Sequence, residues 1–550
     1  MNKFFSLKGK KTEIFISVLY IISLFFISYF HEPWFDEAQA WLISKAGSLW
    51  DIIYSFSKAE GHLPLWYLIL SPFSKLGFPY EFTIKFINIT ICSLAIIIFE
   101  LKSPFPKLIK WLIPFTYFLF YQYGIINRCY SLMILGFVLT AVTYKERNNH
   151  PFKFALSLIF LSLSSAYSII IAFGITLNWL FEILKSSKYK IFKDKRMVSV
   201  YFIFFVFFIL GIILLPANDV GHFFLTDKKF LINLSLMLFV IPISSLFYDC
   251  FQYGHLSVDM ANGPELITCL FAGVIFFITL LFILKCYKKV FLFLVPYLLF
   301  SAFSAKVYFY MHHQGIVVIF LIFIAWVILD EKNKTKIPVW FSKLLQNNFW
   351  NKILNAAGLL IIFSSLSISI YWTITASVND IKYIFNWTRE TAQFIKDYNL
   401  EDKYIVSSYA PPVKENGKII LNTNKINSTE IYPYFKKNII RNFHIREYLT
   451  HIRGNAEEEY QRLRQEQMPD IILNGGLDVV AIYGTKANNA YILAKSYRVT
   501  RIWKDKTYEL TFPVFLERKL FIEKILKERA KLKIPTYTWE KIFKGKIQKK

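Results

Sequence analysis

Two adjacent carboxylates, Asp36 and Glu37, follow the first long apolar run of the chain, residues 14–30. The run is long enough to cross a hydrocarbon core, and the tryptophans on either side of the pair suit the membrane–water boundary. A carboxylate at this depth is costly unless it faces protein or a wet cavity, and it can take a proton from a reacting hydroxyl group. The pair therefore indicates a site of acid–base chemistry. The alternative is two solvated loop carboxylates that favour the start of a helix near Pro33.

Polar residues recur in three later stretches, which read EGHLPLWY at 60–67, YQYGIINRCYSL at 121–132 and KVYFYMHHQG at 306–315. Together with the setting W-x-D-E-A-Q-A-W of the first pair, these stretches resemble the GT-C glycosyltransferases. More narrowly, they resemble the family 39 group, which includes protein O-mannosyltransferases and lipid A aminoarabinose transferases. The resemblance covers roughly the membrane part of the chain. It implies an inverting enzyme that moves a sugar from a polyprenyl phosphate to an extracytoplasmic glycan, lipid or protein, and it does not identify the sugar.

The resemblance places the catalytic carboxylate at Asp36, which we expect to act as the general base on the acceptor hydroxyl. Glu37 would orient the acceptor or a cation, with a side chain that only faces water as the alternative. Glu60 and His62 follow as donor-binding candidates. His62 could hydrogen-bond the donor or the carboxylates, although a single histidine beside a proline turn is often structural.

A leaving phosphate requires cations that neutralise its growing charge. Arg128 begins an expected span, and its guanidinium suits bidentate phosphate binding; snorkelling to lipid headgroups is the alternative. Lys306, His312 and His313 lie between two later spans. We expect them to form a second phosphate clamp, with an aromatic boundary anchor as the alternative.

The carboxylates and histidines of these stretches contain the ligand types of a divalent metal site. Their sequence spacing does not place a ligand set on one element, and some relatives of the resembling families work without metal. We therefore expect no resident metal and no other cofactor, with the lipid-phosphate sugar as co-substrate.

Composition places the chain in a membrane. Of its 550 residues, 55% are hydrophobic and 19% are aromatic, and apolar runs of about 20 residues recur. The formal net charge is +26, and most basic residues lie in short loops and in the last quarter of the chain. Loop clusters of this kind favour membrane lipids over nucleic acid as the partner. The five cysteines show neither a pairing pattern nor metal-ligand spacing.

The apolar runs predict about eleven transmembrane helices. Basic residues before the first run place the N-terminus in the cytoplasm, so that Asp36 emerges outside in a first outer loop at 31–80. The expected spans are about 12–30, 82–100, 111–126, 129–144, two within 154–184, 198–216, 264–284, 290–304, 314–330 and 354–375. Residues 229–248 are apolar enough to span, but an interfacial or re-entrant helix there keeps every short basic loop inside.

The character changes near residue 378, so the chain divides into a membrane domain at 1–377 and an external α/β domain at 378–550. Helices are expected at 381–398 and 456–467, and short strands at 404–408, 418–421, 470–474 and 479–483. The basic tail at 519–550 could hold anionic lipid or wall polymer, with a solvated tail as the alternative.

The fold class expected is therefore a polytopic helical membrane protein of the bacterial cytoplasmic membrane with a small external domain. A flippase of lipid-linked sugar would show internal repeats and charges near mid-span, whereas these charges gather on one side. A glycan polymerase or ligase usually relies on a large late outer loop. A scaffold that binds cell-wall polymer is the non-enzymatic alternative, and it would survive loss of Asp36.

Overall fold

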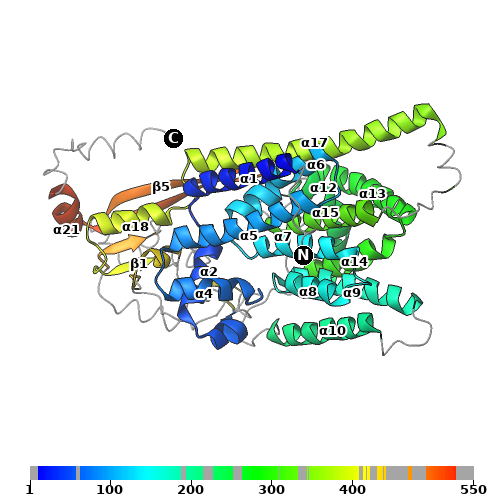
Figure 1. Cartoon of the computed structure of the whole chain (residues 1–550). Helices are drawn as coiled ribbons and strands as arrows, with labels where there is room; N and C mark the ends of the chain where they lie inside the picture. The colour runs from blue at the N-terminus through cyan, green and yellow to red at the C-terminus, as the bar shows by residue number, and fades with distance from the viewer. Residues whose placement is uncertain are drawn as a thin grey trace. The chain divides into compact units, whose positions relative to one another are not determined.

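The computed structural model describes residues 10–56, 62–186, 194–214, 227–251, 263–307, 309–331, 346–407, 413–415, 418–420, 430–437, 439–440, 469–473 and 491–527, with 338 and 344 (Figure 1). By its contacts the chain divides into two units. The first comprises Met1–Pro33, Ile43–Lys382 and Arg501–Tyr508, and the second comprises Trp34–Leu42, Tyr383–Thr500 and Glu509–Lys550. The boundary expected between residues 377 and 378 stays a prediction.

The first unit is helical. Prolines precede or open several helices, where their missing N–H is not needed: Pro79 lies before α5, Pro106 before α6, and Pro151 begins α8. Its helices are α1 (Lys11–Phe30), η1 (Asp51–Phe56), α4 (Leu65–Lys75), α5 (Tyr80–Lys102), α6 (Lys107–Leu112), η2 (Ile113–Phe115), η3 (Phe118–Ile125), α7 (Tyr130–Tyr144), α8 (Pro151–Ser162), α9 (Ala166–Ser186), α10 (Lys195–Leu214), α11 (Asp227–Ser235), η5 (Leu236–Val240), α12 (Ile241–Leu246), α13 (Gly263–Cys286), α14 (Val290–Lys306), η7 (Met311–His313), α15 (Gln314–Glu331) and α17 (Asn348–Lys382).

Within the described residues, eight helices are long and apolar enough to cross a membrane: Lys11–Phe30, Tyr80–Lys102, Ala166–Ser186, Lys195–Ile213, Lys229–Leu246, Gly263–Cys286, Met311–Glu331 and Asn348–Lys382. Three shorter apolar helices accompany them: Tyr130–Tyr144, Pro151–Ser162 and Val290–Lys306. These helices indicate a polytopic helical membrane protein. The count of eleven crossings, and the placement of 229–248 outside that count, stay predictions.

The transmembrane helix expected at 111–126 differs from the structure in its secondary structure. The run at 111–126 is not one α-helix, because Pro114 lies in the 3₁₀ turn η2 and a π-helix, η3, follows. Proline cannot donate within a helix ladder, which accounts for the break. The π-helix carries Tyr121 and Tyr123, and both side chains enter the polar contacts described below.

Charged residues beside the helix ends gather at one end of the first unit. Arg147, just after α7, pairs with Glu182 near the end of α9 at 2.8 Å and with Glu331 at the end of α15 at 2.7 Å. Lys289, directly before α14, also pairs with Glu331. The Arg147 guanidinium lies 4.0 Å from the centre of the Tyr144 ring. The ends of α7, α9 and α15 and the start of α14 therefore lie together.

The starts of α1 and α6 belong to the same end. Glu13 of α1 pairs with Lys110 of α6 at 3.0 Å. Phe99, near the end of α5, contacts Trp326 in the last turns of α15 with ring centres 5.6 Å apart. The ends of α5, α7, α9 and α13, after which basic loops are expected, thus lie at one end of the unit.

The second unit is built on a four-stranded sheet in the order β1-β4-β6-β5 and a separate β2–β3 hairpin. The parallel pair of the sheet is β1 with β4, and the pairing of β4 with β6 is antiparallel. The elements are α18 (Thr388–Asp397), β1 (Ile405–Ser407), β2 (Val413–Glu415), β3 (Lys418–Ile420), β4 (Ile471–Leu473), β5 (Tyr491–Trp503), β6 (Lys506–Glu517), α21 (Arg518–Leu520) and η11 (Phe521–Leu526). The tip of the β5–β6 hairpin, Arg501–Tyr508, belongs to the first unit.

The central strand β4 is buried on both faces. Ile471 and Leu473 belong to one apolar cluster, whereas Ile472 belongs to another with Val406. Successive side chains of a strand point to opposite faces, so a short apolar run suits this place. The strands expected at 404–408, 418–421 and 470–474 are confirmed, whereas the strand at 479–483 and the helix at 456–467 lie outside the described residues.

The helix expected at 381–398 is wrong as one element. The helix α17 runs to Lys382, and α18 begins only at Thr388. Between them, Ile384 forms a parallel bridge with Val499, and its carbonyl accepts the Thr500 N–H at 2.9 Å. These backbone hydrogen bonds replace the helical ones, because the chain joins the edge of the sheet here.

Candidate functional site

Arg128 lies in the short connection between η3 and α7, where two histidines hold its guanidinium. Its Nη1 lies 3.1 Å from His312 Nε2, and its Nη2 lies 3.2 Å from His62 Nε2. A guanidinium only donates, so each imidazole accepts at Nε2 and carries its proton on Nδ1. Both imidazoles are then neutral. Three separate segments of the first unit thus meet at one cation.

The aromatic ring of Tyr130 lies against the Arg128 guanidinium. The Arg128 guanidinium carbon is 5.2 Å from the centre of the Tyr130 ring, at the first residue of α7. Tyr130 stacks on Tyr123 at 4.8 Å and contacts the His312 ring at 5.6 Å. A cation over an aromatic face is stabilised by the ring quadrupole, and the packed rings restrict the rotamers around Arg128.

The neighbouring histidines have different environments. His312 accepts from Arg128, and its carbonyl accepts the Tyr123 hydroxyl at 2.5 Å. His313 accepts the Tyr310 N–H on Nδ1 at 2.9 Å, and its ring lies 4.4 Å from that of Tyr167. The expected clamp is therefore divided: His312 contacts the cation, while His313 packs among aromatic rings and fixes its own turn.

Two further residues, Lys306 and Glu60, are expected from the sequence to bind the donor. Lys306 is the last residue of α14 and is half-buried. Glu60 lies outside the described residues. The arrangement around Arg128 thus comprises His62 and His312 among the residues expected from the sequence.

Asp36 and Glu37 lie in the first turn of α2 (Phe35–Ala46) and belong to the second unit. Glu37 is fully buried, and its Oε2 accepts the Trp34 N–H at 2.9 Å. A glutamate at the third helical position that reaches back to the residue before the helix caps that helix. Asp36, beside it, is partly exposed. Of the two carboxylates, Asp36 is therefore the one open to a reactant, whereas Glu37 has a structural task.

A second polar group was not expected from the sequence. His31, directly after α1, lies with Nδ1 2.9 Å from Asp380 in the last turn of α17. The Tyr121 hydroxyl donates to the other Asp380 oxygen at 2.9 Å, and Lys85 donates to the His31 carbonyl at 2.6 Å. The signal that could have found it is the acidic residue in a long apolar helix, since such residues usually have a specific partner.

Within the part of the chain that the structure describes, no group of three or more His, Cys, Asp or Glu side chains could hold a metal ion. The expectation of no resident metal stays a prediction.

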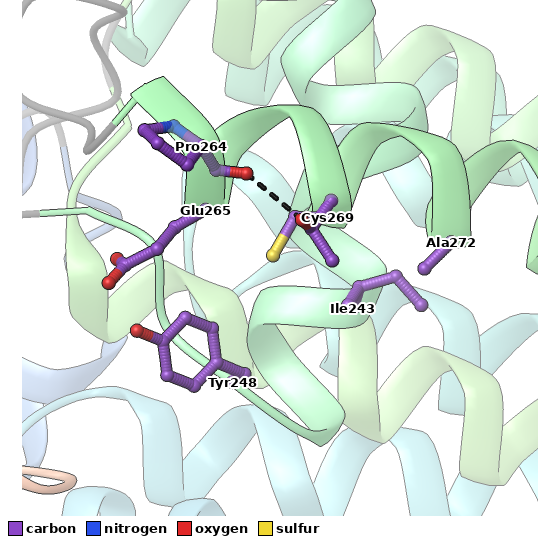
Figure 2. A pocket seen from close by; sticks show the side chains of 7 residues that line it. Ile243, Tyr248, Pro264, Glu265, Cys269 and Ala272 are labelled. Carbon is purple, nitrogen blue, oxygen red and sulfur yellow. Dashed lines mark hydrogen bonds between the residues drawn. The ribbon is translucent and has the colours of Figure 1, made fainter.

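A cavity of about 310 Å³ lies elsewhere in the first unit, between α12 and the start of α13 (Figure 2). Thr268 donates to the Pro264 carbonyl at 2.9 Å, and a hydrogen bond to Glu265 raises the pKa of the Tyr248 hydroxyl to about 12. The cavity is lined by Ile243, Tyr248, Pro264, Glu265, Thr268, Cys269 and Ala272. None of these is a residue expected to act in catalysis, so this cavity lies apart from the expected site residues.

Comparison of the chain with protein-family models, with curated proteins and with solved structures found no match. The functional argument therefore depends on the described residues themselves.

Proposed function

We propose that the chain is a membrane glycosyltransferase of the GT-C type. It would transfer a sugar from a polyprenyl phosphate to a hydroxyl group of an extracytoplasmic glycan, lipid or protein. The observation that carries the proposal is the Arg128 guanidinium held between the neutral imidazoles of His62 and His312. The two imidazoles fix the position of the guanidinium, and a guanidinium matches two phosphate oxygens at once.

The proposed reaction needs a general base and a cation. The Asp36 carboxylate accepts the proton of the acceptor hydroxyl as its oxygen attacks the anomeric carbon. The bond from that carbon to the phosphate oxygen breaks, and the electron pair leaves with the polyprenyl phosphate. Arg128 stabilises this departing charge. Attack opposite to the leaving group inverts the anomeric centre.

We further propose that the end of the first unit with Arg128 faces outside a bacterial cytoplasmic membrane. The support is the clustering of Arg147, Lys289 and Lys110 at one end of that unit, since basic loops favour the cytoplasm. In this arrangement the N-terminus is cytoplasmic, eleven helices cross, and residues 378–550 form an external α/β domain.

The test is sugar transfer by purified protein in detergent from a panel of polyprenyl-phosphate sugars. Arg128→Lys keeps the charge but loses the fork, and should weaken donor binding; Arg128→Ala should weaken it further. Arg498→Ala is the matched control, because Arg498 is a surface arginine paired with Glu509 in the second unit. Wild-type donor affinity in folded Arg128→Ala protein would remove Arg128 from the site. Movement of intact lipid-linked sugar across vesicles without transfer would instead identify a flippase.

A further inference from the structure

A lysine at the turn of the β5–β6 hairpin is completely buried. Lys504 has 0% exposure, and its backbone φ is +55°. This left-handed conformation is unfavourable for a residue with a side chain. The ammonium donates to the Ser244 carbonyl and to Gln314 Oε1, both at 2.6 Å, and lies 3.4 Å from the Asp249 carboxylate. A buried charge on a strained backbone persists only where its surroundings fix it, so these contacts determine where Lys504 lies.

The partner carboxylate is fully hydrogen-bonded. Trp503 Nε1 donates to Asp249 Oδ2 at 2.7 Å, and Ser244 Oγ and the Phe251 N–H each donate to Oδ1 at 3.0 Å. Burial lowers the pKa of the Lys504 ammonium although Asp249 opposes this. Burial would raise the pKa of the Asp249 carboxyl, but the Lys504 charge and the donors hold it below its ordinary value. The carboxylate therefore stays ionised at neutral pH.

This ion pair is connected to the Arg128 site through one side chain. Gln314 is the first residue of α15, directly after the turn η7 that carries His312. Lys504 donates to the Gln314 Oε1, and the Gln314 Nε2 points to Asp249 at 3.5 Å. Within the same turn of chain, His312 Nε2 accepts from Arg128. Lys504 and Asp249 thus hold the residue that begins α15, and this residue fixes the turn that presents His312.

We propose that Lys504 is a positioning residue for Arg128: through Gln314 it fixes the turn of His312, which in turn orients the guanidinium toward a phosphate group. This inference rests on the proposed function only for the identity of the ligand. A role in folding alone would not require a charge, because a buried ion pair replaced by apolar side chains of similar size is often equally stable or more stable. The hydrogen bond to Gln314 is what an apolar replacement cannot supply.

The first measurement is the affinity of the purified full chain in detergent for farnesyl phosphate, a soluble polyprenyl monophosphate, by native mass spectrometry. Lys504→Met and Gln314→Leu should each weaken binding about tenfold, the lower end of the effect of losing an outer-shell partner at metal sites. The double variant Lys504→Met/Gln314→Leu should be no worse than either single variant, because both changes break one path.

Two controls separate positioning from loosening of the fold. Lys506→Met removes a neighbouring lysine of the hairpin that donates only to backbone carbonyls, those of Asp249 at 2.8 Å and Phe251 at 2.5 Å. It should leave the affinity within about twofold. Lys504→Met/Asp249→Asn removes both charges and keeps an amide oxygen as acceptor for the donors to residue 249. It should unfold at a higher temperature than Lys504→Met, which leaves the Asp249 charge buried without its partner, and still show the weakened affinity.

The second measurement needs no ligand. Phenylglyoxal modifies arginine side chains, and peptide mapping gives the modification rate of Arg128 in each variant. Loss of Lys504 or Gln314 should raise this rate several-fold, while Lys506→Met should not. Altered Arg128 reactivity in a protein whose wild type does not bind farnesyl phosphate would retain the positioning role and reject the proposed ligand. Unchanged affinity and unchanged reactivity in folded Lys504→Met protein, or additive losses in the double variant, would overturn the inference.

Discussion

The carboxylate of Asp380 lies 2.9 Å from Nδ1 of His31, although 349 residues separate the two along the chain. Both side chains have 0% exposure. His31 directly follows α1, five residues before Asp36, and Asp380 belongs to the last turn of α17. The residue directly after α1 is therefore held by a side chain of the last helix of the first unit, which is remote in the sequence.

Replacement of Asp380 should unfold this end of the first unit. Asp380→Leu leaves the His31 imidazole and the Tyr121 hydroxyl without their acceptor, and breaking a buried pair costs about 3–5 kcal/mol. Tyr121→Phe removes one hydrogen bond to the same carboxylate, and a hydrogen bond to a charged group contributes about 1.5–3 kcal/mol. Thermal unfolding in detergent should therefore rank wild type, Tyr121→Phe and Asp380→Leu in falling order. Equal unfolding temperatures for wild type and Asp380→Leu would show that the pair does not hold α1.

The Arg147 cluster provides a second stability test at the other end of the unit. Arg147→Met should lower the unfolding temperature clearly, because Glu182 and Glu331 then lose a shared partner. Lys145→Met is the matched control. Lys145, in the same loop as Arg147, pairs with Asp330 at 3.4 Å. The Lys145 side chain is 56% exposed, and exposed ion pairs contribute little to stability. A similar fall in the unfolding temperature of both variants would mean that the two buried ion pairs of Arg147 stabilise the protein no more than an exposed pair.

The sequence predicted the elements that depend on local pattern. Apolar runs indicated α1, α5, α13 and α15, and short apolar runs indicated β1 and β4. The hairpin of β5 and β6 was missed, because lysine, arginine and serine interrupt its alternation and its turn is Lys504-Asp505 rather than a glycine turn. A buried lysine in a left-handed turn has no sequence signature, since its partner Asp249 is remote in the chain.

The candidate site could be predicted in part for the same reason. Arg128, His62 and His312 were each recognised as polar residues near span ends, but no spacing rule joins three separate segments. Their assembly depends on tertiary packing around Tyr130 and Tyr123. The division of work between His312 and His313 is likewise a property of the turn η7, because adjacent residues in a tight turn point in different directions.

The orientation in the membrane gives a topology prediction. A reporter fused after Lys336, beyond α15 and the basic end of the first unit, should be cytoplasmic, because short basic loops stay inside. A reporter fused after Lys403 should be external. Activity of alkaline phosphatase and fluorescence of a cytoplasmic reporter at both sites provide the measurement. Both fusions on one side of the membrane would contradict the proposed crossing by α17, and residues 229–248 would be the first region to re-examine.

Glu37 accepts a hydrogen bond from the Trp34 N–H, so two replacements of Glu37 should differ in stability. Glu37→Gln keeps a carbonyl oxygen that accepts this N–H, so it should retain the stability of the wild type. Glu37→Leu removes the acceptor and should destabilise the protein by about 1 kcal/mol, the usual effect of losing a helix cap. Thermal unfolding measures both. If Glu37→Gln were as unstable as Glu37→Leu, the charge of Glu37 rather than its cap would be the important property.

Asp36 provides the strictest test of the proposed mechanism. Asp36 is partly exposed beside the buried Glu37, and an aspartic acid can accept the proton of the acceptor hydroxyl only in its ionised form. Asp36→Asn preserves shape and removes this ability, so turnover should fall by about 10²–10⁴ while the unfolding temperature and farnesyl phosphate affinity stay unchanged. Glu37→Gln, matched in chemistry and one residue away, should reduce turnover far less, because Glu37 moves no proton. The assay is sugar transfer from a polyprenyl-phosphate donor by purified protein, with chromatography as the check on folding. Turnover near that of the wild type in Asp36→Asn would reject Asp36 as the base and favour a scaffold or flippase.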